Sequence, residues 1–223
     1  MTNFVNAGGH SISFFSMKDS IFNLEAQQLN TSSKIVVGLE RISEAFKVLL
    51  WKQAKTLGLS PIQIQLLIFI AFHKYELCNV SHLAKEFNVT KATVSDAVKV
   101  LDKKGLIIKT HSSTDSRSYI ITLSSKGKQI VNQTNSFADP IKSVLENVNK
   151  TDLDQLYGTL TQLIYGLNRS GILDVQRTCY GCQFYEKKER DHYCHLLKKK
   201  LFTNEIRLDC PEYNEKPTGN EAS

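Results

Sequence analysis

Four of the five cysteines lie together in the last quarter of this 223-residue chain. Cys179 and Cys182 form a Cys-x2-Cys pair, eleven residues separate Cys182 from Cys194, and fifteen more precede Cys210. A Cys-x2-Cys knuckle directs two sulfur atoms at one ion, and four thiolates complete a tetrahedral zinc site or hold a 4Fe–4S cluster. The spacing therefore predicts one metal centre on these four cysteines, with Zn²⁺ and the iron–sulfur cluster as open alternatives.

Other ligands and other uses of these thiols remain open at this point. His192 and His195 flank Cys194, so either could replace a thiolate. A segment this short and charged is not expected to build its own core, and bound zinc would supply folding free energy of ~10 kcal/mol or more. The centre could make the protein metal- or redox-responsive. The alternatives are a thiol–disulfide oxidoreductase that uses Cys179 and Cys182, and a zinc-stabilised tail that docks another protein.

The elements that precede the cysteines begin with two short helices. Within NVSHLAKEFNVTKATVSDAVKVLDKKGLI, Ser81 is expected to cap the first helix and Thr90 the second. The second helix turns one apolar face inward, and Gly105 ends it. The residues of that face are Val94, Val98 and Leu101. Two short helices joined by so brief a turn predict a helix-turn-helix.

Strands and longer helices surround this pair. LIIKTH and SYIITL, residues 106–111 and 118–123, are rich in β-branched residues and predict a two-stranded wing. Upstream, apolar spacing predicts a helix over 34–57 and a second that starts at Pro61, with Ser60 as its cap. Downstream we expect a helix over 124–148, with Pro140 as a kink or break, and another after Thr151 as its cap. The predicted fold class is mainly α, a winged helix-turn-helix with a small cysteine-rich C-terminal module.

The stretch LAKEFNVTKATVSDAVKVLDKKGLIIKTHSSTDSRSYIITLSSKGKQIV, with Asp115 and Arg117 at the wing tip, resembles the MarR family of winged-helix transcriptional regulators. The resemblance covers residues 34–167. It implies a homodimer with interleaved terminal helices, a pseudo-palindromic operator in double-stranded DNA, and a small-molecule effector as a further partner. Three segments follow: an N-terminal arm over 1–32, the MarR-like domain over 33–170, and the four-cysteine tail over 171–223.

The charge distribution also favours a DNA partner. Residues 74–128 hold ten Lys or Arg against five acids, which accounts for +5 of the chain's net charge of +6. N-terminal residues of a recognition helix reach base edges, and a wing arginine suits a narrow minor groove. Asp96 is an unusual acidic residue on the DNA-facing side of the recognition helix. It is expected to accept a hydrogen bond from a cytosine amino group or to pair with a neighbouring Lys or Arg. The candidate DNA contacts are Lys91, Ala92, Thr93, Ser95, Asp96, Lys99 and Arg117.

Composition and motifs exclude several other classes. A hydrophobic content of 41% with 22% charged residues is typical of a globular protein. The strongest apolar run, residues 66–72, is too short to span a bilayer, and residues 1–20 lack the pattern of a secretory signal. We therefore expect a cytoplasmic protein without a membrane partner. Outside the Cys-x2-Cys pair no nucleophile–base pairing or phosphate-binding glycine loop is evident, so we predict that the chain is not an enzyme.

Overall fold

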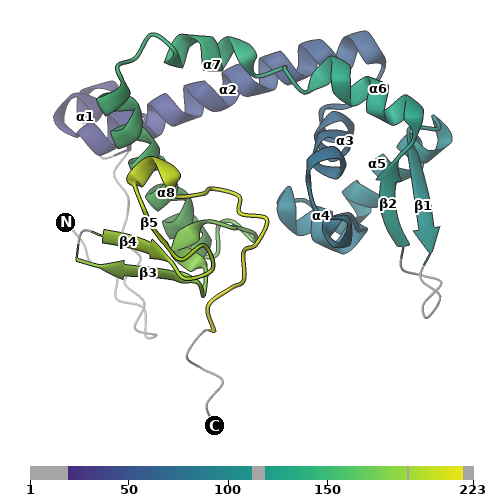
Figure 1. Ribbon diagram of the computed structural model, residues 1–223. Coiled ribbons are helices and arrows are strands. Elements are labelled where there is room, and N and C mark those ends of the chain that lie inside the picture. Colours follow the sequence, from purple (N-terminus) through teal and green to yellow (C-terminus); the bar gives the residue numbers. More distant parts are fainter. Residues whose placement is uncertain (1–19, 112–118, 190, 218–223) are drawn as a thin grey trace, which may run out of the picture. The chain divides into compact units, whose positions relative to one another are not determined.

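The computed structural model describes residues 20–111, 119–189 and 191–217 (Figure 1). Its contacts divide the chain into two compact units, residues 1–49 and residues 50–223. The described part of the first unit holds α1 (Leu24–Leu29) and most of α2 (Thr31–Leu57). The division falls inside α2, and the segment limits expected from the sequence, at 32 and 170, stay predictions.

Three helices of the second unit surround the turn, and the last two form the predicted helix-turn-helix. They are α3 (Pro61–Phe72), α4 (Val80–Glu86) and α5 (Lys91–Lys103), with the short 3-10 helix η2 (Tyr75–Leu77) between the first two. Ser60 caps α3 and forms a capping box with Gln63, while Thr90 caps α5. Gly105 follows α5 with a φ of +69°, a left-handed conformation that suits glycine. The two caps and the glycine stop were predicted from the sequence, whereas the capping box with Gln63 was not.

Two predicted caps are wrong by two residues. Asn79, and not Ser81, caps α4, because its side-chain oxygen accepts from the His82 N–H at 2.9 Å. Asn149, and not Thr151, caps α8 (Lys150–Arg169) by accepting from the Asp152 N–H at 3.0 Å. In both places an asparagine shortly before the expected cap reaches the free N–H groups first, so the helix starts earlier.

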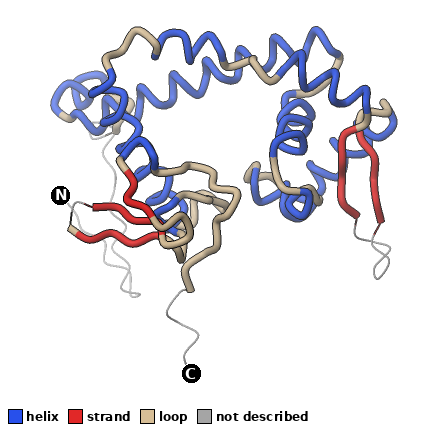
Figure 2. Tube along the Cα trace, viewed as in Figure 1, coloured by secondary structure: helices blue, strands red, loops and turns tan. Residues whose placement is uncertain are grey.

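The wing has the predicted strands β1 (Ile107–His111) and β2 (Tyr119–Leu123), paired antiparallel (Figure 2). The helix expected over 124–148, with Pro140 as a kink or break, is divided into α6 (Ser125–Thr134) and α7 (Asp139–Leu145). Pro140 lies in the first turn of α7. Proline has no N–H for the preceding turn and its ring crowds that turn, so the chain begins a new helix there. We call residues 61–134 the helix-turn-helix lobe.

The core of the helix-turn-helix lobe is continuous and apolar. Its fully buried side chains come from α3, α4, α5 and β2. Cys78, the fifth cysteine, is 1% exposed within this core, and its carbonyl accepts from the Ile121 N–H at 2.8 Å. The buried residues Ile64, Leu66, Leu67, Leu83, Val94, Val98, Leu101 and Ile121 all have 0% exposure. This core fixes α5 and the base of the wing against α3.

The cysteine tail folds into short strands and helices that the sequence did not predict. It contains η3 (Cys179–Gly181), β3 (Tyr185–Lys188), β4 (Asp191–Cys194), β5 (Lys199–Leu201) and η4 (Thr203–Glu205). The strands form an antiparallel sheet in the order β3-β4-β5. Tyr185, Leu201 and Ile206 are buried with two of the cysteines, so the segment does have a small core. We call residues 172–217 the cysteine module.

Within the described residues, no single helix is long and apolar enough to cross a membrane. The helices α2 and α3, which are bent by 93° relative to each other, reach the required length and apolar composition only as a pair.

Candidate nucleic-acid interface and cysteine pocket

The recognition helix α5 divides into two faces as the sequence predicted. Its inward residues Val94, Val98 and Leu101 are 0% exposed, since they pack in the lobe core. The candidate contacts lie on the other face. Lys91, Ala92, Thr93, Asp96 and Lys99 are exposed, and Ser95 is half-buried. The helix therefore presents a polar, partly cationic surface to solvent, as a helix that enters a major groove must.

Local hydrogen bonds order this surface. The Thr90 hydroxyl accepts from the Thr93 N–H at 3.1 Å and lies 2.9 Å from the Thr93 hydroxyl. Asp96 accepts from Lys99 at 2.9 Å, and both side chains are more than 70% exposed. The hydrogen bond and charge of Asp96 raise the pKa of Lys99 above its usual value. The acidic residue thus holds a neighbouring cation, and a nearby phosphate would compete with it for Lys99.

The wing carries the remaining predicted DNA contact. Its strands pair over five residues from Ile107 opposite Leu123 to His111 opposite Tyr119, which gives the finger a regular base. Arg117 and its predicted partner Asp115 lie outside the described residues. The structure therefore gives the base of the wing, and the role of Arg117 stays a prediction.

The four clustered cysteines line one small pocket in the cysteine module. Its volume is about 30 Å³, and its walls include the apolar residues Phe184, Leu196, Leu197 and Leu201. Cys179 and Cys182 are buried, whereas Cys194 and Cys210 are half-buried. The backbone N–H of Arg207 donates to the Cys179 sulfur at 3.2 Å. Residues that are 31 positions apart in sequence thus bring their thiols to one apolar site.

The residue types of this pocket suit a metal ion, but within the described residues their arrangement does not form a coordination site. The donor set is right, because four thiols in an apolar shell are typical of zinc and iron–sulfur sites. Within the described ranges, however, no three His, Cys, Asp or Glu side chains are arranged as ligands of one ion. The pocket is not lined by the two candidate histidines. His192 contacts the Tyr185 hydroxyl at 2.5 Å, and His195 contacts Glu186 at 3.0 Å.

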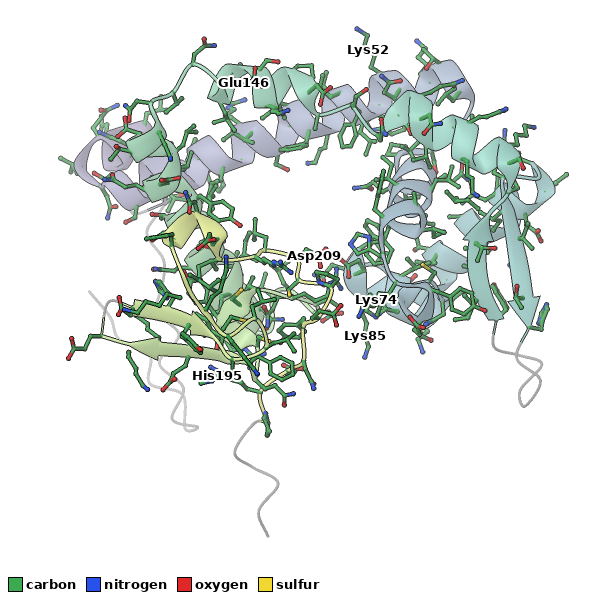
Figure 3. The ribbon with its side chains drawn as sticks, viewed as in Figure 1. Lys52, Lys74, Lys85, Glu146, His195 and Asp209 are labelled. Carbon is green, nitrogen blue, oxygen red and sulfur yellow. The ribbon has the colours of Figure 1, made fainter. Side chains whose placement is uncertain are left out.

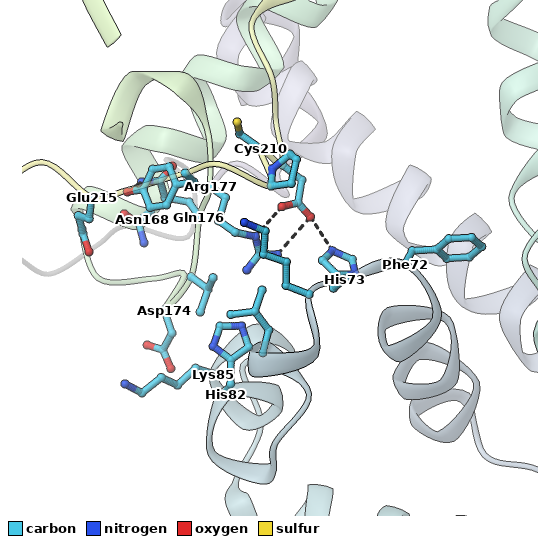
Figure 4. Close-up of a pocket in the computed structure, with 16 residues that line it drawn as sticks. Phe72, His73, His82, Lys85, Asn168, Asp174, Gln176, Arg177, Cys210 and Glu215 are labelled. Atoms are coloured by element: carbon cyan, nitrogen blue, oxygen red, sulfur yellow. Dashed lines mark hydrogen bonds and ion pairs between the residues drawn. The ribbon is translucent and has the colours of Figure 1, made fainter. Parts of the chain in front are cut away.

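The cysteine module meets the helix-turn-helix lobe beside a pocket of about 720 Å³ (Figures 3 and 4). This pocket is lined by Lys74 and Lys85 of the lobe and by Arg177 and Asp209 of the module. Arg177 donates to Glu86 and to Asp209. Sequence reasoning missed Arg177 and Asp209, because their partners Glu86 and His73 lie 91 and 136 residues away and no local pattern marks them.

Comparisons with known proteins agree with this geometry. Residues 57–118 match the model of the MarR family. The HTH-type transcriptional repressor YetL of Bacillus subtilis (strain 168) is 29% identical over 112 residues, 50% of this chain and 67% of that protein. The HTH-type transcriptional regulator Hpr of Geobacillus thermodenitrificans (strain NG80-2) is 25% identical over 158 residues, 68% of this chain and 74% of that protein.

A solved structure gives the same picture of the fold. The crystal structure of the S. aureus MepR–DNA complex is similar with a TM-score of 0.53 and 21% identity, over 59% of this chain and 97% of that chain. At that identity the likeness shows the winged helix-turn-helix fold. The matched family and both relatives are transcriptional regulators, which confirms the prediction that the chain is not an enzyme. Together the fold and the relatives support a DNA-binding regulator.

Proposed function

We propose that this chain is a MarR-type transcriptional regulator that binds a pseudo-palindromic operator in double-stranded DNA as a homodimer. The observation that carries the proposal is the exposed polar face of α5 above a core in which Val94, Val98 and Leu101 are fully buried. Lys91 and Lys99 supply phosphate contacts, while Ala92, Thr93 and Ser95 are short enough to meet base edges. Arg117 enters the adjacent minor groove. We expect such a regulator to act in the cytoplasm.

Fluorescence anisotropy with a duplex from the region upstream of the protein's own gene tests DNA binding. Affinity should fall steeply with salt because lysines displace counterions from phosphate. Lys91→Ala should weaken binding and reduce the salt slope by about 1. Lys200→Ala is the matched control, since Lys200 pairs with Asp191 at 2.7 Å in the cysteine module. Equal affinity for this duplex and for random competitor DNA would refute sequence-specific binding.

The homodimer is supported by apolar side chains that each protomer leaves exposed. On α2, Ile35, Ile42 and Phe46 are 52%, 48% and 40% exposed. On α8, Leu156 and Leu163 are 43% and 39% exposed. Apolar stripes of this kind mark protein interfaces. Light scattering after gel filtration should therefore give twice the mass of the protomer, and a protomer mass at micromolar concentration would exclude the dimer.

We further propose that the four-cysteine pocket holds one metal centre. Its support is the convergence of Cys179, Cys182, Cys194 and Cys210 on one apolar pocket. Four thiols in an apolar shell suit a single Zn²⁺ ion as well as a 4Fe–4S cluster, and we take the zinc ion as the occupant to be tested first. Bound there, zinc would supply a tetrahedral crosslink between η3, β4 and the segment before Pro211. The iron–sulfur cluster stays the alternative.

Elemental analysis of protein purified without oxygen tests the metal centre. One zinc per chain is expected, and Cys182→Ser combined with Cys194→Ser should abolish it. Cys78→Ala is the matched control, because Cys78 lies in the core of the helix-turn-helix lobe and not in the pocket. A brown protein with iron and sulfide would select the cluster. Unchanged metal content in the double variant would refute the site.

The oxidoreductase alternative is not favoured. A catalytic thiol needs access and a low pKa. Cys179 and Cys182 are only 8% and 6% exposed, and burial raises the pKa of Cys179. We also propose that the regulator responds to metal or redox state through the four-cysteine pocket, and a small-molecule effector stays a further expected partner.

A further inference from the structure

A second face of the helix-turn-helix lobe binds the cysteine module through one largely buried arginine. The Arg177 guanidinium donates to both carboxylate oxygens of Glu86 on α4, at 2.8 and 3.0 Å. It also donates to Asp209 through Nε at 2.5 Å and Nη2 at 3.1 Å. The side chains of Arg177 and Glu86 are 11% and 18% exposed, so this pair is largely shielded from water, whereas the Asp209 side chain is 45% exposed. Planar bidentate pairs of this type fix orientation as well as distance.

Two neighbours extend this contact to the end of α3. The Nε2 atom of His73 lies 2.8 Å from Asp209, as the dashed lines in Figure 4 show. The His73 ring stacks on Phe69 with centroids 3.7 Å apart, and the Arg177 guanidinium lies 5.8 Å from the same Phe69 ring. The network therefore joins the module to α3 and α4 at once, through groups that are held by the lobe core.

The turn of the helix-turn-helix provides an independent anchor. Asn88 lies between α4 and α5 with a φ of +53°. Its side-chain amide donates to the carbonyl of Ile172 at 2.8 Å and accepts from the N–H of Asp174 at 3.2 Å. The Asn88 side chain thus forms hydrogen bonds with two backbone groups of the segment that leads from α8 to Cys179. The module is attached to the residue that joins α4 to the recognition helix.

The anchoring segments are the same segments that carry two of the pocket cysteines. Arg177 lies two residues before Cys179, and Asp209 lies immediately before Cys210. The Cys210 N–H donates to the Arg177 carbonyl at 3.1 Å, so the two segments run side by side. A change in the positions of the thiols must therefore move Arg177 or Asp209, or strain the hydrogen bonds between them.

We propose that Arg177 and Asn88 couple the state of the four-cysteine pocket to the position of the recognition helix. The proposal rests on the proposed function, whose regulation it specifies. The route runs from the thiols through Arg177 to α4 and through Asn88 to the start of α5. It does not pass through the dimer helices. Since α4 and α5 share the lobe core, a shift of α4 moves the face that carries Lys91 and Thr93.

A double-mutant cycle tests the coupling in the full-length protein. One change is Cys182→Ser with Cys194→Ser, which alters the pocket away from the anchoring segments. The other is Arg177→Gln, with Asn88→Gly as a second variant, because glycine keeps the left-handed turn and removes only the amide. The readouts are operator affinity by anisotropy and hydrogen exchange of the α4 amides by mass spectrometry. The cycle compares the effect of the cysteine change with and without each anchor.

The expected result is a change in operator affinity of at least about five-fold on cysteine substitution, as is typical of allosteric coupling. In the Arg177→Gln or Asn88→Gly background this change should fall below about two-fold, and α4 exchange should no longer respond. Lys200→Ala is the control, because it breaks a module ion pair that does not touch the lobe. In that background the full effect should persist.

Two results would overturn the coupling. The first is a cysteine effect of the same size with and without the anchors. The second is a cysteine substitution that changes neither operator affinity nor α4 exchange when Arg177 is present. Loss of the proposed function looks different. If the protein binds no operator, the proposed function is refuted. The coupling would still stand if hydrogen exchange of α4 responded to the cysteine substitutions only when Arg177 is present.

Discussion

Replacing Gly127 by alanine should loosen the contact between α6 and the base of the wing. Gly127 lies in the first turn of α6, against the backbone of Leu106, which precedes β1. A Cβ atom built on Gly127 would lie 2.0 Å from the Leu106 carbonyl oxygen and 3.4 Å from a Leu123 side-chain carbon. An unstrained carbon–oxygen contact is about 3.3 Å. The backbone would therefore have to separate by more than an ångström.

The cost of that separation follows from the contacts that it breaks. The Leu106 carbonyl accepts from the Ser124 N–H at 3.1 Å, and such a bond contributes roughly 1 kcal/mol. Overpacking of a well-packed site costs about 1–3 kcal/mol, whereas alanine gains roughly 1 kcal/mol over glycine within a helix. The net loss is about 2 kcal/mol in the free energy of unfolding. For a chain of this size that corresponds to a fall in Tm of roughly 4–8 °C.

Urea unfolding followed by circular dichroism measures this loss, and Gly166→Ala is the matched control. Gly166 also lies within a helix, α8, but a Cβ atom there would meet no atom within 4 Å. The control should therefore be as stable as the wild type or up to about 1 kcal/mol more stable. If Gly127→Ala is as stable as Gly166→Ala, the close approach of α6 to Leu106 does not exist in solution.

Three further predictions concern the lobe core. Leu101→Ala, at a 0% exposed site, should lower the free energy of unfolding by about 2–5 kcal/mol, and a loss below 1 kcal/mol in urea titrations would contradict the packing. Burial lowers the pKa of His82, and the charges of Arg177 and Lys85 lower it further, while Glu86 raises it by less. The folded protein therefore binds a proton at His82 less readily than the unfolded chain does. The free energy of unfolding should be greatest above pH ~6.5, the usual pKa of histidine, and should decline below it. His82→Gln should flatten that decline between pH 7.5 and 5.5, and an unchanged slope would exclude His82 as its source. Burial raises the pKa of Cys78 to about 11, so native protein should leave Cys78 unalkylated by iodoacetamide at pH 8, and rapid labelling seen by peptide mass spectrometry would contradict its burial.

Local sequence determined most of the helix-turn-helix lobe. Ser60 with Pro61, Thr90, and Gly105 fixed the ends of α3 and α5, because caps and left-handed turns depend on groups within three or four residues. The period of Val94, Val98 and Leu101 fixed which face of α5 is free. Where two neighbouring residues compete for one role, as Asn79 and Ser81 do, local reasoning found the helix and missed its first residue.

The tertiary structure decided how the cysteines are used. Their spacing predicted a shared site, and the structure places all four on one pocket, but the sheet of β3, β4 and β5 that surrounds it had no periodic signal in such short strands. Arg177 and Asn88 were not predictable as anchors. Their partners Glu86 and Ile172 lie 91 and 84 residues away, and contacts at that separation depend on how whole elements pack. Sequence therefore determined the local elements of the candidate DNA-binding surface, whereas long-range packing decided what holds the cysteine module against the helix-turn-helix lobe.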